Sequence, residues 1–252
     1  MKLPEMILFD YGHTLLYEPG ADPLGGDTAL FPYITKNPNN YTPADICRIT
    51  QEICAEVYDD DRRVDFHENN LRRMLNEYLE IELAVSFEEA ERIVWNGISA
   101  GAVMPGAPEM LALLREKGIR TGVISNLTWS GAALAERIAR LLPEHRFDFI
   151  LASSEYVCRK PSRFLFELAL KKAKLAPEQV WFCGDSAAAD VLGAQGAGIF
   201  PVLYESAAVE NPWAGRNDDV RIDGDYLHIC DWRELTDALD ALGSVREAFS
   251  VS

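Results

Sequence analysis

The sequence predicts an α/β fold, with a doubly wound, Rossmann-like parallel sheet core and an inserted α-helical cap domain. Short apolar runs alternate with longer helical segments, which is the pattern of a parallel sheet covered by helices on both faces. Polar residues follow several of the apolar runs, and in such sheets ligands bind beyond the carboxyl ends of the strands. The interval from residue 16 to 100 breaks this alternation and has a helical pattern, which predicts the insertion.

The alternation begins with residues 6–10, an apolar run that ends in Asp10 and is typical of a buried strand. After the irregular interval, residues 107–117 carry apolar residues at helical spacing and stop at Gly118. The remaining expected strands are 119–125, 147–153, 180–185 and 199–204, and the remaining expected helices are 130–142, 162–174, 187–196 and 232–242. These segments assign residues 1–15 and 101–252 to a discontinuous α/β core domain.

Residues 16–100 are the predicted helical cap domain. One helix begins with Pro43 at its first position and carries a single apolar stripe, which consists of Ile46, Ile49, Ile53 and Val57. A second helix is expected over residues 66–79. A third begins at a capping box formed by Ser86 and Glu89.

Two other stretches of this interval are expected to lack regular structure or to face solvent. Residues 19–40 are rich in glycine, proline and asparagine, which predicts a linker loop that also forms part of the cleft wall. The acidic run at 59–61 stands next to Arg62 and Arg63 and is most simply a solvated helix end.

Composition limits the classes of partner. The 252-residue chain has a formal net charge of −16, which repels nucleic-acid polymers and anionic membranes, so neither is an expected partner. Its five cysteines are scattered and never spaced as CxxC, as in proteins with reduced thiols. Without a long apolar span or a signal-peptide pattern, the protein is expected to be soluble and cytoplasmic.

Side chains that phosphoryl chemistry uses lie in four short segments, each at or beyond the end of an expected strand. The segments are Asp10-Tyr11-Gly12-His13-Thr14, Ser125-Asn126, Arg159-Lys160-Pro161, and Gly184-Asp185-Ser186 followed by Asp190. Their order and contexts resemble the four motifs of the haloacid dehalogenase superfamily, in its magnesium-dependent, phosphatase-like branch. The resemblance spans residues 7 to about 204, and residues 104–126 and 184–198 extend it beyond the motifs themselves.

This resemblance implies a Mg²⁺-dependent hydrolase of small phosphorylated metabolites, in which Asp10 is the nucleophile and forms an aspartyl phosphate. Asp10, the backbone carbonyl of Gly12 and Asp185 match the family's metal-ligand positions. Asp190 is either a water-mediated ligand or the partner that orients Lys160. Because several carboxylates close together repel one another, the arrangement requires the ion as its cofactor.

The same resemblance assigns Ser125, Asn126 and Lys160 to the binding of the phosphoryl oxygens, with Ser125 and Lys160 also catalytic. Taken singly, these residues have simpler explanations, since a Ser-Asn pair often caps a turn and a lysine before proline is often a solvated loop cation. Their occurrence together favours the phosphate site. Arg159 is equally consistent with a second positive charge there and with a surface residue.

Gly12 departs from the family pattern. Phosphatases of the family carry a second aspartate at this position, which protonates the leaving oxygen and then activates water. Three explanations compete: His13 transfers the proton, the substrate has a good leaving group such as an acyl phosphate, or the protein is a catalytically weakened member that binds a ligand or a protein partner.

Other branches of the family also lack the second aspartate. Dehalogenases do not use a metal and lack the Gly-Asp-Ser segment seen at 184–186. Phosphonate-cleaving members use a cap lysine as a Schiff base, for which Lys36 is the sole candidate in or near the cap. Both are weaker interpretations than the phosphatase. The identity of the substrate and the oligomeric state stay open.

Overall fold

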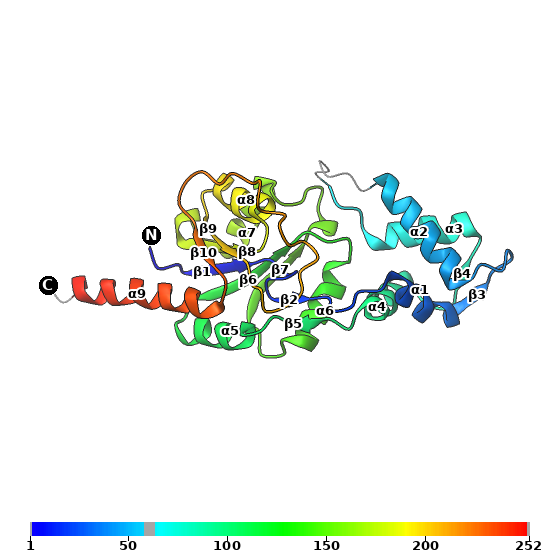
Figure 1. Ribbon diagram of the computed structural model, residues 1–252, viewed down its shortest axis with the longest axis horizontal. Coiled ribbons are helices and arrows are strands. Elements are labelled where there is room, and N and C mark those ends of the chain that lie inside the picture. Colours follow the sequence, from blue (N-terminus) through cyan, green and yellow to red (C-terminus); the bar gives the residue numbers. More distant parts are fainter. Residues whose placement is uncertain (1, 58–63, 251–252) are drawn as a thin grey trace.

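The computed structural model describes residues 2–57 and 64–250 (Figure 1). The acidic run at 59–61 and the adjacent Arg62 and Arg63 lie outside the described residues. The core is a six-stranded sheet with the strand order β10-β9-β8-β1-β6-β7, and every hydrogen-bonded pair in it is parallel. The predicted α/β fold class with a parallel sheet is confirmed.

The strand bounds follow the apolar runs closely. The strands are β1 (Met6–Phe9), β6 (Arg120–Ser125), β7 (Phe147–Ala152), β8 (Val180–Gly184), β9 (Phe200–Tyr204) and β10 (Leu227–Ile229). Only β10 was not expected among these, because its three residues are too short to form a recognisable apolar run.

Strand β1 lies inside the sheet, and its side chains alternate between two cores. Ile7 and Phe9 face a core covered by α5 (Ala107–Glu116), α6 (Gly131–Leu141) and α9 (Trp232–Ser250). Met6 and Leu8 face the opposite core, which is covered by α7 (Arg163–Ala173) and α8 (Leu192–Gly196). This two-sided burial explains why β1 is apolar at every position.

The direction of winding reverses at β1. The chain passes from β1 to β6 and β7 on one side, and it returns to β8 and β9 on the other. Ligands of doubly wound sheets bind at such a reversal, beyond the carboxyl ends of the strands. The fold therefore places a binding crevice between the ends of β1 and β8.

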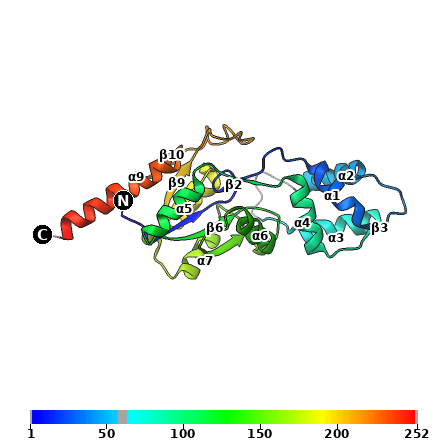
Figure 2. The same ribbon diagram turned by 90° about the horizontal axis from the view of Figure 1, so that it is seen from below.

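The inserted region is helical, with α1 (Pro23–Leu30), α2 (Pro43–Val57), α3 (Glu68–Leu79) and α4 (Phe87–Ile98), and it also contains the short paired strands β3 (Ile34–Lys36) and β4 (Glu82–Leu83). In both views these helices lie together at one end of the molecule and α9 at the other (Figures 1 and 2). Antiparallel strands β2 (Leu16–Tyr17) and β5 (Ala102–Val103) join the region to the core. That residues 16–100 form a domain of their own stays a prediction, and these paired strands lie at its expected limits.

The prediction of a loop over residues 19–40 is wrong for two segments, which form helix α1 and strand β3. Asp22 caps α1 by accepting a hydrogen bond from the backbone of Leu24 at 3.1 Å, and proline follows the cap. Two glycines inside α1 disfavour a helix when it is considered alone. However, a Cβ atom on Gly25 would lie 2.6 Å from the carbonyl oxygen of Gly97 in α4. The glycines allow the two backbones to pack closely, so tertiary contact outweighs local propensity.

The other inserted helices agree with the expected ones. Helix α3 begins at Glu68, where the His67 ring nitrogen Nδ1 accepts from the backbone of Asn69 at 3.1 Å. The hydroxyl of Ser86 caps α4 by accepting from the backbone of Glu89 at 3.2 Å, as half of the expected capping box. No described helix is long and apolar enough to cross a membrane.

A buried charge cluster joins the helices of the insert. Arg72 on α3 lies between Asp27 and Glu68, each 3.5 Å from a guanidinium nitrogen. Burial is the main reason that the pKa of Glu68 rises to about 7, and the neighbouring Glu91 and Asp27 raise it further. Glu68 therefore keeps its proton in the folded protein over a pH range in which it loses that proton when unfolded.

This shift predicts that the Glu68 contribution to the free energy of unfolding falls as the pH rises from about 4.5 to about 7. In that range the folded state binds more protons than the unfolded state, so raising the pH favours unfolding. Glu68→Gln removes the contribution of Glu68 to the pH dependence of the free energy of unfolding. The stability of the variant relative to the native protein should therefore be higher at pH 8 than at pH 5. Urea unfolding at both pH values measures the difference, with Glu77→Gln at an exposed position of α3 as the control. Equal pH dependence in all three proteins would contradict the assignment.

Candidate active site

The predicted site residues meet at the reversal point of the sheet. Asp10 follows β1, Ser125 ends β6, and Asp185 follows β8. The backbone amide of Asp10 donates to the carbonyl of Cys183 at 2.9 Å, which holds the first and fourth motifs in register. The parallel sheet therefore brings together residues that are far apart in the sequence.

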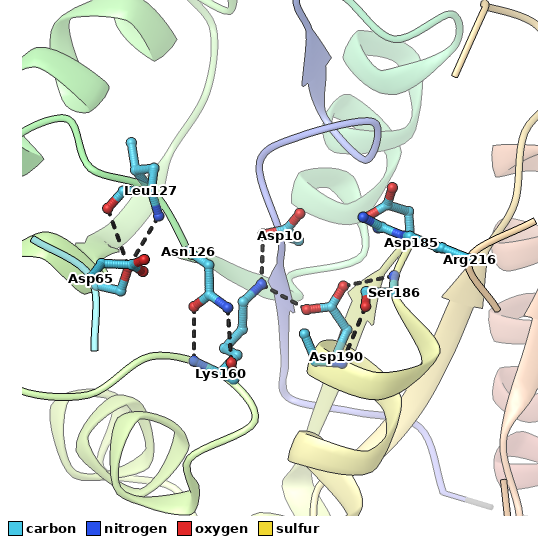
Figure 3. Close-up of polar contacts among 11 residues, drawn as sticks. Asp10, Asp65, Asn126, Leu127, Lys160, Asp185, Ser186, Asp190 and Arg216 are labelled. Atoms are coloured by element: carbon cyan, nitrogen blue, oxygen red, sulfur yellow. Dashed lines mark hydrogen bonds and ion pairs between the residues drawn. The ribbon is translucent and has the colours of Figure 1, made fainter. Parts of the chain in front are cut away.

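Lys160 lies at the centre of this group (Figure 3). Its Nζ atom is 2.6 Å from Asp10 Oδ1 and 2.7 Å from Asp190 Oδ1, and the residue is only 3% exposed. Burial alone would lower the pKa of Lys160, but attraction to Asp10 and Asp190 outweighs it and raises that pKa. The lysine is thus a buried, charged group shared between two carboxylates.

The Asn126 side chain fixes the backbone of this lysine. Its Oδ1 accepts from the Lys160 amide at 2.8 Å, and its Nδ2 donates to the Lys160 carbonyl at 2.9 Å. The side chain predicted to bind phosphate is therefore bonded to the loop that carries Lys160. Phosphate binding by Asn126 stays a prediction, and the contact described here positions Lys160.

Asp190 lies in a π-helical turn, Ala187–Val191, and both of its oxygens are used. Oδ1 accepts from Lys160, and Oδ2 accepts from the backbone amide of Ser186 at 3.0 Å. A Cβ atom on Gly184 would lie 2.3 Å from Asp190 Oδ2, so only glycine leaves room for this carboxylate. Of the two roles expected for Asp190, these contacts favour that of orienting Lys160.

Asp10, Asp185 and Asp190 form an acidic cluster whose candidate ligand oxygens all lie within 4.8 Å of one another. Burial raises the pKa of Asp10, and burial together with the charge of Asp10 raises that of Asp185 to about 8. The Oδ2 atom of Asp185 is buried and accepts no hydrogen bond from the described residues. Such an oxygen is available to a cation, and hard divalent cations prefer carboxylate ligands.

Arg216 is a charged residue of the cleft that sequence reasoning missed. It lies in the irregular segment 205–226 between β9 and β10, and its guanidinium pairs with Asp185 Oδ1 (Figure 3). A lone arginine in a loop has no distinctive spacing. The available signal was its place after a strand of the parallel sheet, where the chain returns to the binding edge.

The cluster opens into a cavity of about 550 Å³. Trp95 of α4 forms part of its wall and stacks on Trp129, with ring centroids 5.0 Å apart and planes 7° apart. Nearby, the Glu91 carboxylate accepts from the Ser130 hydroxyl at 2.7 Å. Helix α4 of the insert therefore both lines the cavity and binds the core beside it.

Two of the three remaining candidates from the sequence line the cavity. Arg159 lines the cavity, with one guanidinium nitrogen 3.5 Å from Asp65 Oδ1, so it is not a free surface residue. His13 also lines the cavity, and burial together with the charge of Arg216 lowers its pKa. Lys36 is not among the lining residues and pairs with Glu82 at 2.8 Å on the exposed part of the insert.

Residues 7–198 match the model of a family described as haloacid dehalogenase-like hydrolase. The chain belongs to this family. The hydrolase is 35% identical over 108 residues to a glyceraldehyde 3-phosphate phosphatase of Methanothermobacter thermautotrophicus, a match that covers 42% of this chain and 46% of that protein. The chain spans less than half the length of the curated relatives it matches.

Solved structures match this hydrolase over nearly its whole length. A haloacid dehalogenase phosphatase from Thermococcus onnurineus is 18% identical with a TM-score of 0.59, covering 95% of this chain and 98% of that one. A hydrolase of the same superfamily from Bacillus subtilis, bound to magnesium, is 19% identical with a TM-score of 0.52, covering 95% of this chain and 99% of that one. At these identities the likeness shows the fold, with its inserted helical region.

The contacts of Lys160 predict a large loss of stability when its charge is removed. In metal-free buffer, Lys160→Met should lower the free energy of unfolding by about 3 kcal/mol, because it leaves two buried carboxylates without their counter-charge. Urea unfolding in the presence of a chelator measures this loss. Lys171→Met, at an exposed position of α7, is the matched control. A loss no larger than that of the control would mean that the ion pairs give no net stability.

Proposed function

We propose that the protein is a Mg²⁺-dependent hydrolase of small phosphorylated metabolites that works through an aspartyl phosphate on Asp10. The observation that carries the proposal is the position of the Asp10 carboxylate. It lies at the end of β1, is held by Lys160 at 2.6 Å, and lines the cavity together with Ser125. Family membership supports hydrolysis, and the relative named as a glyceraldehyde 3-phosphate phosphatase supports a small phosphorylated metabolite as the substrate class.

The residues present fit a divalent cation. Three carboxylates face one another, and Asp185 offers a buried oxygen without a hydrogen-bond partner in the described chain. Asp10, the carbonyl of Gly12 and Asp185 would hold the ion, with Asp190 retained by Lys160. When bound, the ion supplies the positive charge that offsets the repulsion between the carboxylates and a phosphate dianion.

The chain's own groups then divide the reaction. An oxygen of Asp10 attacks phosphorus and the bond to the leaving oxygen breaks. Water later hydrolyses the aspartyl phosphate, which releases inorganic phosphate and regenerates the Asp10 carboxylate. Lys160 and the Ser125 hydroxyl bind the phosphoryl oxygens, whose charge they stabilise through preorganised donors. Asn126 keeps Lys160 in place through the two hydrogen bonds to its backbone.

Proton transfer to the leaving group is the weak step, because Gly12 has no side chain. We propose that the natural substrate has a leaving group that departs with little protonation, such as the carboxylate of an acyl phosphate. General acid catalysis contributes typically about 10² to 10⁴ in rate, so its loss matters most for poor leaving groups. His13 lines the same cavity and is the other candidate for this proton transfer.

Asp10→Asn should abolish turnover, because the amide oxygen is too weak a nucleophile to form the covalent intermediate. A panel of acyl phosphates, sugar phosphates and nucleotides, assayed with and without Mg²⁺, measures the effect. Asp218→Asn, at an exposed loop position, should keep native activity. Metal-dependent turnover that survives in Asp10→Asn would refute the proposed nucleophile.

Gly12→Asp should raise the hydrolysis of phosphate monoesters by at least about 10-fold and leave acyl phosphates nearly unchanged. A Cβ atom at Gly12 would meet no atom within 4 Å, so the first atom of a side chain can be added there without a shift of the backbone. Gly12→Asn is the matched control, because it has the same size and cannot transfer the proton. If the native protein is inactive and only Gly12→Asp turns over substrate, the native protein is the catalytically weakened, ligand-binding member. No gain in either variant would show that the absent acid is not what limits the rate.

A further inference from the structure

Arg216 joins the reaction edge of the sheet from a segment outside the four motifs. Its guanidinium pairs with Asp185 Oδ1, while Asp185 Oδ2 lies buried and accepts no hydrogen bond from the described residues. The arginine thus pairs with one oxygen of a carboxylate whose other oxygen suits a cation. Its side chain keeps 32% exposure, so it is not locked into the core.

The other cations of the cleft have partners that the proposed chemistry leaves in place. Lys160 keeps Asp190 at 2.7 Å, whatever Asp10 binds. Arg159 keeps Asp65, whose carboxylate is buried on the far side of Lys160 from Arg216 (Figure 3). Arg216 differs from both, because the carboxylate it pairs with, that of Asp185, is itself a proposed Mg²⁺ ligand, whereas Lys160 retains Asp190 and Arg159 retains Asp65.

Mg²⁺ and the Arg216 guanidinium repel each other when both contact the Asp185 carboxylate. A divalent cation at Asp185 draws away the negative charge that holds Arg216 and repels the guanidinium. The arginine has space to move, because it lines both the active-site cavity and a second cavity of about 350 Å³. His13 lies on the same boundary between the two cavities.

A guanidinium released in this cavity finds itself beside the groups that bind the transferred phosphate. Its planar fork of donors matches the oxygens of a phosphate or a carboxylate. We propose that Arg216 is an anion-binding residue of the active site, which holds Asp185 while the metal site is empty and turns to the anionic group of the substrate once Mg²⁺ has bound. This inference rests on the proposed function, because it takes Asp185 as a magnesium ligand.

The proposal predicts effects of opposite sign from one substitution. Without substrate, Arg216→Gln should tighten Mg²⁺ binding by roughly 3- to 10-fold, because a competing positive charge is removed. With Mg²⁺ saturating, the same variant should bind inorganic phosphate roughly 10- to 100-fold more weakly, because a charged hydrogen-bond donor is lost. Without Mg²⁺, the native protein and the variant should bind phosphate with the same affinity, because Arg216 is then ion-paired with Asp185 and does not contact the phosphate.

Titration calorimetry on the full chain, with Mg²⁺ and inorganic phosphate as the probes, measures all three quantities. Arg221→Gln is the matched control, because Arg221 lies in the same segment, is highly exposed and pairs with Asp223 at 2.9 Å. Arg216→Lys is a second variant that keeps the charge but not the planar fork. It should retain the native Mg²⁺ affinity and lose part of the phosphate affinity.

The possible outcomes separate this inference from the proposed function. Weaker Mg²⁺ binding in Arg216→Gln with unchanged phosphate binding would overturn it, and would make Arg216 an orienting partner of Asp185 instead. A variant that matches Arg221→Gln in every titration would also overturn it. A native protein that binds no Mg²⁺ would refute the proposed function and this inference together, whereas native Mg²⁺ binding with no effect of Arg216 would refute the inference alone.

Discussion

Mutual repulsion among three buried carboxylates is the constraint on which the arrangement of this edge depends. Asp10, Asp185 and Asp190 come from two strand ends and one helical turn, and the parallel sheet forces them together. Their charges are partly offset by Lys160, which lies between two of them, and by Arg216, which pairs with the third. The residues around them serve this balance, since Asn126 fixes the backbone of Lys160 and Gly184 leaves space for Asp190.

The same balance separates phosphate binding from proton transfer. The residues proposed to hold a phosphoryl group and its cation lie at the strand ends and at Lys160, and they line one cavity. The group that would move a proton belongs to the turn after β1, where Gly12 leaves open space. Under the proposed function, such a site lacks assistance to the leaving group but retains the groups that bind the phosphoryl oxygens, so the leaving group would decide which substrates it can turn over.

Most of the core could be predicted from the sequence, because a strand buried on both faces must be apolar throughout, and β1 and β8 are. The motif residues could be placed at one edge of the sheet because each follows a strand, and the carboxyl ends of parallel strands lie at the same edge. Helix α1 could not be predicted from the sequence, because glycine has a low helix propensity and the compensating contact with Gly97 is visible only in the structure. Arg216 could not either, because its contact with Asp185 depends on the course of an irregular segment that leaves no periodic trace. Local sequence patterns thus predicted the strands of the sheet. Helix α1 and the contact of Arg216 depend instead on close packing between segments that are distant in the sequence.

The stacked pair of Trp95 and Trp129 has a consequence of a different kind. One indole belongs to the helical insert and the other to the core segment after β6, and they lie nearly parallel at 5.0 Å. At that separation the excited states of the two rings couple electronically, and the coupling falls steeply as the rings part. The ultraviolet signal of this tryptophan pair therefore depends on the distance between the helical insert and the sheet, and it comes from the protein's own side chains.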